Sequence, residues 1–339
     1  MDNKPFVLAN GTLLSIHDDK FILPAAERPA ASKSIPIPVI DLDEKQASLI
    51  GKIRDACEGH GVFHIINHGV PKELCRKMIG AVHDFFRLPA EERSHLFTDD
   101  KTKPLRVSNF YLNGDDDKFT MWSEVLAHPW HPSDDFSHLL PRNPPHYREL
   151  AGEYAKEVGW LVTRLLRLIS QALGLKKDYL QERLGDKPRL VAHANYYPPC
   201  PRPELTLGSL SHTDVIAITV LLQSEDVSAL QVMQDGQWVP VDPLPGALLV
   251  NIGDQIEVMS NGKYKSVHHR VVTNKDLDRA SIAMFYGPNM DSMIGPIDEL
   301  LDEEHPPIYR TYCFREFMEE FLRQESTVWR VKEAFRLNH

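Results

Sequence analysis

The segment His212-Thr213-Asp214 places an imidazole and a carboxylate two residues apart at the start of a predicted strand. Side chains two apart on a strand point to the same face, so both groups could reach one metal ion. By itself the triplet is weak evidence, because the chain contains 16 histidines and the segment His17-Asp18-Asp19 repeats the pattern. We expect that second copy, in a polar N-terminal region, to lie in solvent and to bind no metal.

A third metal-binding residue is predicted in the segment 264–272, which has the composition of a strand. Alternation places Val267, His269 and Val271 on one face, and the two valines indicate that this face points into the protein. His269 is therefore the predicted third ligand, while His268 would point outward or lie beside the site. Two imidazoles and one carboxylate with open coordination positions are typical of non-haem iron(II) oxygenases. The open positions are where a co-substrate and dioxygen would bind.

A site for an anion is predicted on another strand of the same region. Arg279 and Ser281 are two residues apart and share a face that Ala283 and Phe285 continue. A buried guanidinium needs a negatively charged partner, and no acidic residue of this strand lies on the same face. An arginine and a hydroxyl together are suited to a carboxylate, so we expect a ligand with that group to bind here.

Neutral side chains around such a ligand are expected on the strand that precedes Pro198-Pro199. Asn195 and Tyr197 share a face of this strand and would add hydrogen-bond donors. His193 lies on the same face.

These side chains require a framework of strands and helices, and the N-terminal half contains signals for both. Apolar residues with helical spacing occur at about 44–57, 71–86 and 146–172, and again in the tail at about 314–335. Strands are expected at 37–42, at a sheet edge because of its prolines, and at 61–66, fully buried. The stretches 98–120 and 129–145 are expected to form loops, the second with five prolines covering a surface.

From about residue 190 to 290, short β-branched and aromatic runs alternate with turn residues, which predicts an antiparallel barrel or double sheet. We therefore expect a mixed α/β fold with an all-β core and helices before and after it. The expected regions are an N-terminal extension over 1–35, a mostly helical region over 36–185, a catalytic β core over 186–300 and a C-terminal helical tail over 301–339.

Composition excludes several other classes of protein. The chain has 38 basic and 48 acidic residues, a net charge of −10 and no long basic run, so nucleic acid and anionic membrane are not expected partners. Its four cysteines form no C-x-x-C pair, and no secretory apolar segment follows Met1, which favours a reducing, cytoplasmic location. A transition metal would therefore be held by imidazole and carboxylate, not by thiolate.

Several motifs together resemble those of the plant-type iron(II)- and 2-oxoglutarate-dependent dioxygenases, in order as well as in identity. The resemblance extends from about residue 35 to 325. The matching segments are Pro38–Leu42, Gly61–Val70, Asn195–Pro201, His212–Asp214, Asn261–Arg270 and Arg279–Ser281. The resemblance implies a double-stranded β-helix, which is a distorted jelly roll, with N-terminal and C-terminal helices packed outside it.

The resemblance also implies roles for individual residues. The iron(II) ligands of the family correspond to His212, Asp214 and His269. The residues that bind 2-oxoglutarate correspond to Arg279 and Ser281, which hold its distal carboxylate, with Tyr197 and Asn195 in support. The matching position of Phe285 lines the substrate pocket in the family, and weaker candidates for substrate contact are His193, Tyr111 and Leu210. Dioxygen would be the oxidant and ascorbate the reductant.

The expected reaction is oxidation of a small plant specialised metabolite, such as an alkaloid or a flavonoid or other phenolic, with release of succinate and carbon dioxide. Hydroxylation, desaturation, demethylation and ring closure would all begin with the same hydrogen abstraction. Aromatic residues near the site favour a flat molecule, and the acidic net charge permits a cationic alkaloid. Three alternatives stay open: a hydroxylase that degrades a hormone such as salicylate, an iron oxidase that does not use 2-oxoglutarate, and a non-catalytic ligand-binding relative. We expect a monomer with no obligate protein partner.

Overall fold

Two β-sheets packed against each other form the centre of the protein. The computed structural model describes residues 6–29, 35–113, 118–324 and 331–337. The larger sheet has the order β1 (Val39–Asp41), β2 (Val62–Ile66), β12 (Leu248–Ile252), β9 (Ile218–Gln223), β14 (Arg279–Gly287), β7 (Arg189–Tyr197), β6 (Glu124–Pro129) and β3 (Arg106–Ser108). The smaller sheet has the order β11 (Gln237–Pro240), β10 (Leu230–Gln234), β13 (His269–Val272) and β8 (Leu207–His212). The expected double sheet is therefore confirmed.

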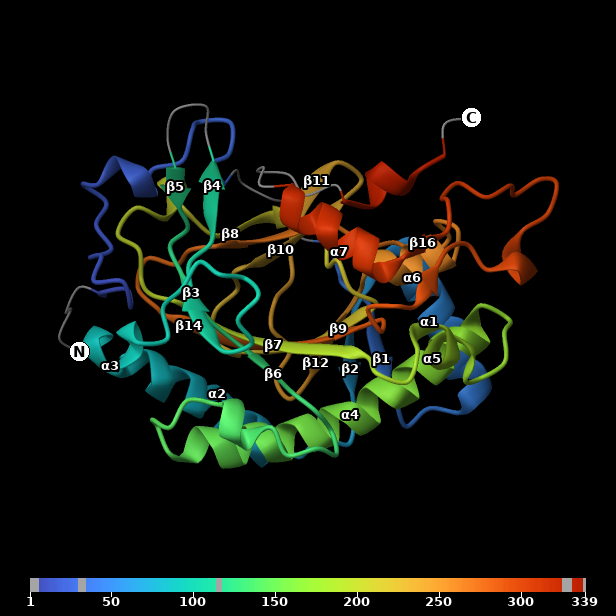
Figure 1. Cartoon of the computed structure of the whole chain (residues 1–339), viewed down its shortest axis with the longest axis horizontal. Coiled ribbons are helices and arrows are strands. Elements are labelled where there is room, and N and C mark those ends of the chain that lie inside the picture. Colours follow the sequence, from blue (N-terminus) through green and yellow to red (C-terminus); the bar gives the residue numbers. More distant parts are fainter. Residues whose placement is uncertain (1–5, 30–34, 114–117, 325–330, 338–339) are drawn as a thin grey trace.

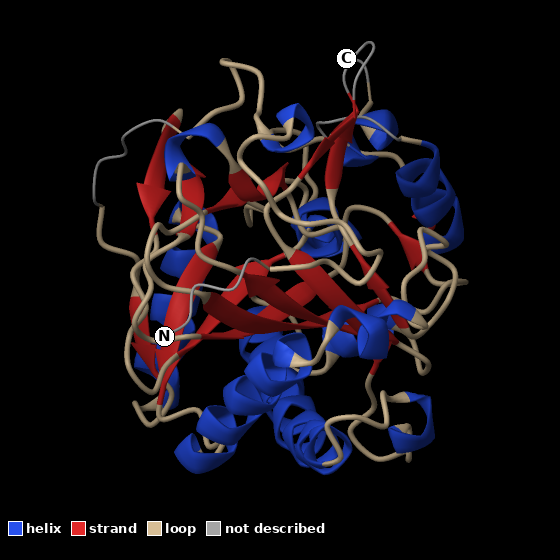
Figure 2. Cartoon of the chain, turned by 90° about the vertical axis from the view of Figure 1, so that its left-hand side faces the viewer, coloured by secondary structure: helices blue, strands red, loops and turns tan. Residues whose placement is uncertain are grey.

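Helices cover the face of the large sheet that points away from the small one (Figure 1). The α-helices are α1 (Gln46–Gly59), α2 (Lys72–Arg87), α3 (Ala90–Ser94), α4 (His146–Ala172), α5 (Tyr179–Leu184), α6 (Asp254–Met259) and α7 (Phe314–Arg323). Short 3-10 helices are η1 (Asp19–Phe21), η2 (Ser137–Leu139), η3 (Pro203–Leu205), η4 (Asp298–Leu300) and η5 (Val331–Phe335). Figure 2 shows the layer of helices beneath the strands.

The three helices expected in the N-terminal half are confirmed as α1, α2 and α4, with α4 beginning and ending at the expected residues. In α4, residues such as Tyr154, Val158, Leu161 and Leu165 recur at three- and four-residue steps and are buried. This stripe packs against α1, α2 and β9. The helix therefore supports the outer face of the sheet whose inner face carries the predicted site.

Strand β7 shows how the two faces of the large sheet differ. Leu190, Ala192 and Ala194 are buried under the helices, in the larger apolar cluster. The alternate residues point to the other side, which we call the inner face because it faces the small sheet. There, a second apolar cluster joins residues of both sheets: Tyr197, Leu221, Leu249 and Ala283 from the large one, and Leu230, Val232, Val239 and Val271 from the small one.

Three expectations about local structure are wrong. The stretch 98–120 is not all loop, because it contains β3 and the ribbon of β4 (Tyr111–Asn113) and β5 (Lys118–Thr120). The run beginning at His212 is not a strand: this residue ends β8, and Asp214 lies in the following loop. The strand expected over 264–272 begins only at His269, after α6 and a connecting segment. Strands of three residues are too short to show periodicity, which explains the first error.

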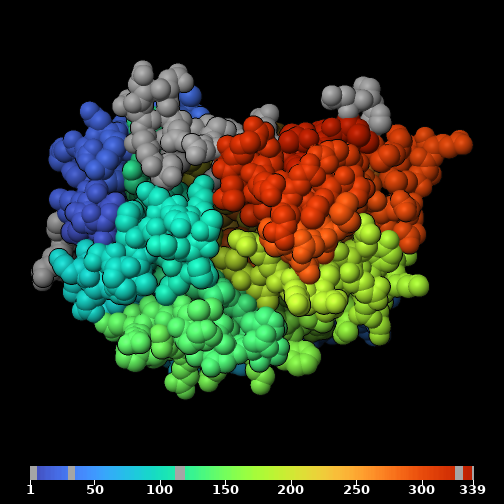
Figure 3. All heavy atoms as spheres, viewed as in Figure 1, coloured from blue at the N-terminus to red at the C-terminus, as the bar shows by residue number. Residues whose placement is uncertain are grey.

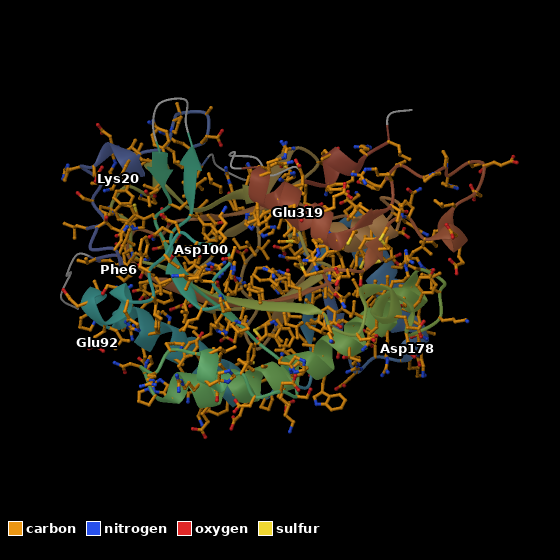
Figure 4. All side chains as sticks on the ribbon, in the orientation of Figure 1. Phe6, Lys20, Glu92, Asp100, Asp178 and Glu319 are labelled. Atoms are coloured by element: carbon orange, nitrogen blue, oxygen red, sulfur yellow. The ribbon has the colours of Figure 1, made fainter. Side chains whose placement is uncertain are left out.

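The N-terminal segment is packed, although residues 1–35 were expected to form a polar extension with His17 in solvent. Leu8, Leu14 and Phe21 are buried together with Trp122 in a separate small cluster. The rings of Phe21 and Trp122 meet edge to face with centroids 5.5 Å apart. Figure 4 shows Phe6 at the same end of the molecule as α3 and Glu92. This segment lacks regular spacing, so its burial was not visible in the sequence.

At the C-terminal end, α7 stops at Arg323 and η5 follows at Val331–Phe335, so the expected helix over 314–335 is confirmed only in its first part. Two further short strands, β15 (Met293–Ile294) and β16 (Tyr312–Cys313), pair with each other.

The edge position expected for the first strand is confirmed, since among the described strands β1 pairs with β2 alone. In the described ranges, no helix is both long and apolar enough to cross a bilayer. Residues 114–117 of the loop expected over 98–120 lie outside the described residues.

Candidate active site

Three predicted side chains converge between the two sheets. His212 ends β8 and His269 begins β13, and the two residues face each other directly in the antiparallel pair. Their rings have centroids 4.2 Å apart. Asp214 lies two residues beyond His212, and its Oδ1 is 3.7 Å from Nε2 of His269. One ligand atom from each of the three lies within 4.8 Å of the others, so this group could hold a metal ion.

Hydrogen bonds with neighbouring groups orient all three side chains. Nδ1 of His212 lies 2.8 Å from the carbonyl oxygen of Leu210, and Nδ1 of His269 lies 3.3 Å from that of Val267. These contacts involve Nδ1 of both rings, so Nε2 is the atom suited to a metal. Such hydrogen bonds to the second ring nitrogen are typical of metal-binding histidines.

The carboxylate of Asp214 is held in the same way. Its Oδ2 accepts hydrogen bonds from Oγ1 of Thr219 at 2.6 Å and from Nδ2 of Asn251 at 3.2 Å. Both donors are buried and come from the adjacent strands β9 and β12. The arrangement leaves Oδ1 on the side of the two imidazoles.

The donor set fits a non-haem iron(II) ion, because two neutral imidazoles and one carboxylate occupy one side of a metal in such proteins. Burial and the nearby His269 together lower the pKa of His212 to about 4, so the ring is in the neutral form that binds metals at pH 7. Among residues 6–29, 35–113, 118–324 and 331–337, no other three His, Cys, Asp or Glu side chains meet in this way. His17 is exposed and His268 lies outside the group, as expected.

A buried cation lies further along the inner face. Arg279 is 2 % exposed and pairs with Tyr197 across β14 and β7, with the guanidinium 5.0 Å from the ring centre. Its Nη2 donates to Oε1 of Gln223 at 2.7 Å. The two other nitrogens, Nε and Nη1, are buried and have no hydrogen-bond partner among the described residues. A buried charge without a counter-charge is costly, so this site is complete only when an anion is present.

Neutral groups flank this cation as the alternation of the strands indicated. Ser281 pairs with Asn195, and Nδ2 of Asn195 donates to Oγ of Ser281 at 3.3 Å. Both side chains are buried. A guanidinium with two unused donors beside a hydroxyl fits the distal carboxylate of 2-oxoglutarate.

The residues predicted to contact a substrate are only partly brought together. The rings of His193 and Phe285 meet edge to face with centroids 4.9 Å apart. Leu210 packs in a small apolar cluster with Phe110 and other residues. Tyr111 lies on β4, but its side chain is outside the described part of the structure. Surface hollows beside Trp160 and beside Arg310 contain none of the predicted site residues.

Several residues of the site were not found from the sequence. Thr219 and Gln223 lie on the inner face of β9, and Asn251 lies on β12. A signal existed for the first two, since they are polar residues four apart in the otherwise apolar strand Ile218–Gln223. Phe110, whose ring centroid is 6.4 Å from that of His193, was missed because it lies in a segment expected to be a loop.

Comparisons with known proteins agree with this arrangement. A family model described as the 2OG-Fe(II) oxygenase superfamily matches residues 189–288, and one described as non-haem dioxygenase in morphine synthesis N-terminal matches residues 37–147. Flavanone 3-dioxygenase 2 of Oryza sativa subsp. japonica is 39% identical over 329 residues, covering 95% of this chain and 96% of that protein. Hyoscyamine 6-dioxygenase of Hyoscyamus niger is 36% identical over 335 residues, covering 94% and 96%.

A solved structure is similar over nearly the whole chain. The crystal structure of JOX2 in complex with 2OG, Fe and JA has a TM-score of 0.86 and 35% sequence identity, and the match covers 99% of both chains. The chain therefore belongs to the iron(II)- and 2-oxoglutarate-dependent dioxygenases and is an oxidoreductase of that family.

Proposed function

We propose that this protein oxidises a C–H bond of a small plant specialised metabolite, with release of succinate and carbon dioxide. His212, Asp214 and His269 would hold iron(II), and Arg279 with Ser281 would bind the distal carboxylate of 2-oxoglutarate. When bound, the iron and the 2-oxoglutarate supply the capacity to activate dioxygen, with ascorbate as reductant.

The observation that carries this proposal is the unpaired state of Arg279. Among the described residues it has two buried nitrogens without hydrogen-bond partners and no carboxylate in contact. A co-substrate with a carboxylate supplies the missing partner, and Tyr197 offers a hydroxyl and a ring beside it.

The remaining side chains of the site position the metal ligands and shield the reacting carbon from water. Thr219 and Asn251 keep Oδ1 of Asp214 directed at the two imidazoles, and burial keeps His212 neutral. Phe285 and His193 form an aromatic surface on the inner face, against which an apolar substrate would pack. A substrate held there excludes water from the reacting carbon.

The substrate class is inferred more coarsely than the reaction. The relatives are named for a flavanone and for hyoscyamine, so a flavonoid or other phenolic and an alkaloid are both candidates. The similarity to JOX2, solved with JA, favours as a second candidate a hydroxylase that acts on a hormone.

We propose that the protein works as a monomer without an obligate partner.

The test is to incubate the iron-loaded protein with 2-oxoglutarate and a panel of plant metabolites and to measure succinate release. We expect at least one compound to stimulate release, with oxidised product formed in equal amount. Product formed without 2-oxoglutarate would indicate the oxidase alternative. If no compound stimulated succinate release from intact, iron-loaded protein, the proposed function would be wrong.

A further inference from the structure

Two arginines lie on the inner face of the large sheet, away from the 2-oxoglutarate site. Arg106 of β3 pairs with Ala127 of β6, and Ala127 pairs with His193 of β7. Directly paired residues of antiparallel strands point to the same face, so Arg106 lies in the same row as His193. Arg189 begins β7, four residues before His193, and therefore also points to the inner face.

Solvent reaches this part of the inner face. Along β7, Arg189 is exposed and Val191 and His193 are partly accessible, whereas the residues between them are buried under the helices. Arg106 is also partly accessible. Figure 3 shows the segment that leads into β3 at the surface next to the C-terminal segment. Lys101 belongs to this segment, and its Nζ lies 5.9 Å from the ring centre of Phe321 in α7.

Neither arginine forms an ion pair within the described ranges. Arg106 donates one hydrogen bond, from Nη1 to the carbonyl oxygen of Lys103 at 2.9 Å. By contrast, exposed arginines elsewhere hold carboxylates at short distance, as Arg76 does with Glu73 at 2.7 Å. The pair therefore keeps most of its hydrogen-bond donors available.

The register places Arg106 level with His193, two strands away, and Arg189 four residues before His193 on the same face, so two long side chains flank this part of the inner face. Burial lowers the pKa of Arg106, the charge of Arg189 lowers it further, and Asp100 opposes this. Figure 4 shows Asp100 beside β3. Burial lowers the pKa of His193 to about 3, with contributions from Arg106, His128, His212 and Arg189. Like charges held together in partly buried surroundings repel, and an anion between them would remove that repulsion.

This pair is distinct from the site of Arg279. Arg279 pairs with Tyr197 at the end of β7, whereas Arg189 is the first residue of the strand. Eight residues of strand span roughly 26 Å. His193 lies midway, with its ring against Phe285, and Phe285 pairs directly with Thr219, whose hydroxyl donates to Asp214. A molecule that packs on His193 and Phe285 could therefore reach the iron site and the two arginines at the same time.

We propose that Arg106 and Arg189 bind a carboxylate of the substrate, so that this enzyme acts on organic carboxylic acids with a flat apolar body. The inference rests on the proposed function and narrows it. Two planar guanidinium groups match the geometry of a carboxylate, and the aromatic pair of His193 and Phe285 receives the apolar body. A cationic alkaloid would be repelled, which reverses the weak expectation drawn from the net charge.

The experiment measures binding without turnover. The full chain, loaded with iron and 2-oxoglutarate and kept free of oxygen, is titrated by calorimetry with cinnamic acid, its methyl ester and phenethylamine. We expect the acid to bind at least about tenfold more tightly than the ester, since one charged hydrogen bond is worth that factor, and the amine not to bind. Arg106→Gln and Arg189→Gln should each remove most of this preference, and Arg189→Lys should keep part of it.

Arg76→Gln is the matched control, because it removes an exposed arginine of α2 far from the site, and it should leave the preference unchanged. Equal binding of acid and ester, no binding of the acid, or a preference that survives both glutamine variants would overturn the proposal. The proposed function fails separately. If only neutral compounds stimulated succinate release, the proposed oxygenase function would stand and the proposed carboxylate site would be wrong. If the acid bound in an arginine-dependent way but no compound was turned over, the carboxylate site would stand and the proposed function would be wrong.

Discussion

Oγ1 of Thr219 donates a 2.6 Å hydrogen bond to Oδ2 of Asp214, and both groups are buried. This contact joins β9 of the large sheet to the loop after β8 of the small one. It fixes which carboxylate oxygen faces the imidazoles of His212 and His269. The orientation of the metal site therefore depends on a residue that touches no metal.

Replacing Thr219 by valine keeps the size of the side chain and removes the hydrogen bond. We expect iron(II) to bind about 10- to 100-fold more weakly, because neighbours that orient metal ligands typically contribute that much. Metal titration of the apo-protein gives the affinity. Thr163→Val in α4 is the control, since its hydroxyl donates to the carbonyl oxygen of Gly159 at 3.0 Å, within the same helix. Similar iron affinity in both variants would show that Asp214 needs no such support.

His268 and His269 are adjacent, but only His269 belongs to the group around Asp214. We expect His269→Ala to abolish iron-dependent turnover and to reduce the iron content of the purified protein. His268→Ala should retain much of both, because that side chain is partly accessible and lies 3.4 Å from Oγ of Ser211. Iron content and succinate release are measured for both. Equal losses would mean that the roles assigned to the two histidines are wrong.

The candidate metal ligands could be found from the sequence because their residue types, their motifs and the resemblance to the family marked them, although the strands from which their facing was argued begin and end elsewhere. The residues that orient them could not. Thr219 and Asn251 reach Asp214 only because the sheet order places β12 beside β9, and sheet order is not visible in local patterns. In the same way, Arg106 and His193 share a row only through the register of β3, β6 and β7.

The helices were predicted to within two residues where a long amphipathic stripe existed, as in α4. Predictions of local structure failed where the buried residues do not recur at regular intervals along the sequence. Leu8 and Phe21 are buried by contact with Trp122, a residue about a hundred positions further along the chain. Strands β3, β4 and β5 have three residues each, too few for alternation to be recognised.

Arg279 should destabilise the protein when 2-oxoglutarate is absent. In Arg279→Met the unpaired buried charge is gone, so we expect the thermal midpoint without ligand to be unchanged or higher. In the wild type, 2-oxoglutarate at 100 times its dissociation constant should stabilise by about 2.7 kcal/mol. Most of that gain should be lost in the variant, because charged hydrogen bonds contribute about 1.5–3 kcal/mol. Calorimetric melting with and without 2-oxoglutarate measures both effects.

Arg270→Met is the control for that comparison. Arg270 is also buried, but its guanidinium lies 4.2 Å from the ring centre of Trp238 and donates to Oε1 of Gln231 at 2.8 Å. Because Nη2 of Arg270 is also buried without a partner among the described residues, its loss should likewise leave the midpoint without ligand unchanged or higher, but it should leave the gain from 2-oxoglutarate intact. A gain that survived in Arg279→Met would contradict the assigned role of Arg279.

A buried ion pair of Arg93 with Glu124 holds the N-terminal segment on the body of the protein. Arg93 is 1% exposed and Glu124 is 0% exposed. Oε1 of Glu124 accepts from the backbone N–H of Ala9 at 2.5 Å, and Nη2 of Arg93 donates to the carbonyl oxygen of Val7 at 2.8 Å. Both charges thus bind the segment as well as each other.

We expect Glu124→Ala to lower the free energy of unfolding by about 3–5 kcal/mol, because it leaves a buried guanidinium without its counter-charge. Glu73→Ala breaks an exposed pair with Arg76 and should cost no more than about 1 kcal/mol. Urea unfolding gives both values. The double variant Arg93→Met with Glu124→Leu should recover part of the loss, since it removes both buried charges and replaces them with apolar volume. Amide hydrogen exchange in residues 6–14 should increase in the single variant, and a small loss with unchanged exchange would show that the pair does not anchor the segment.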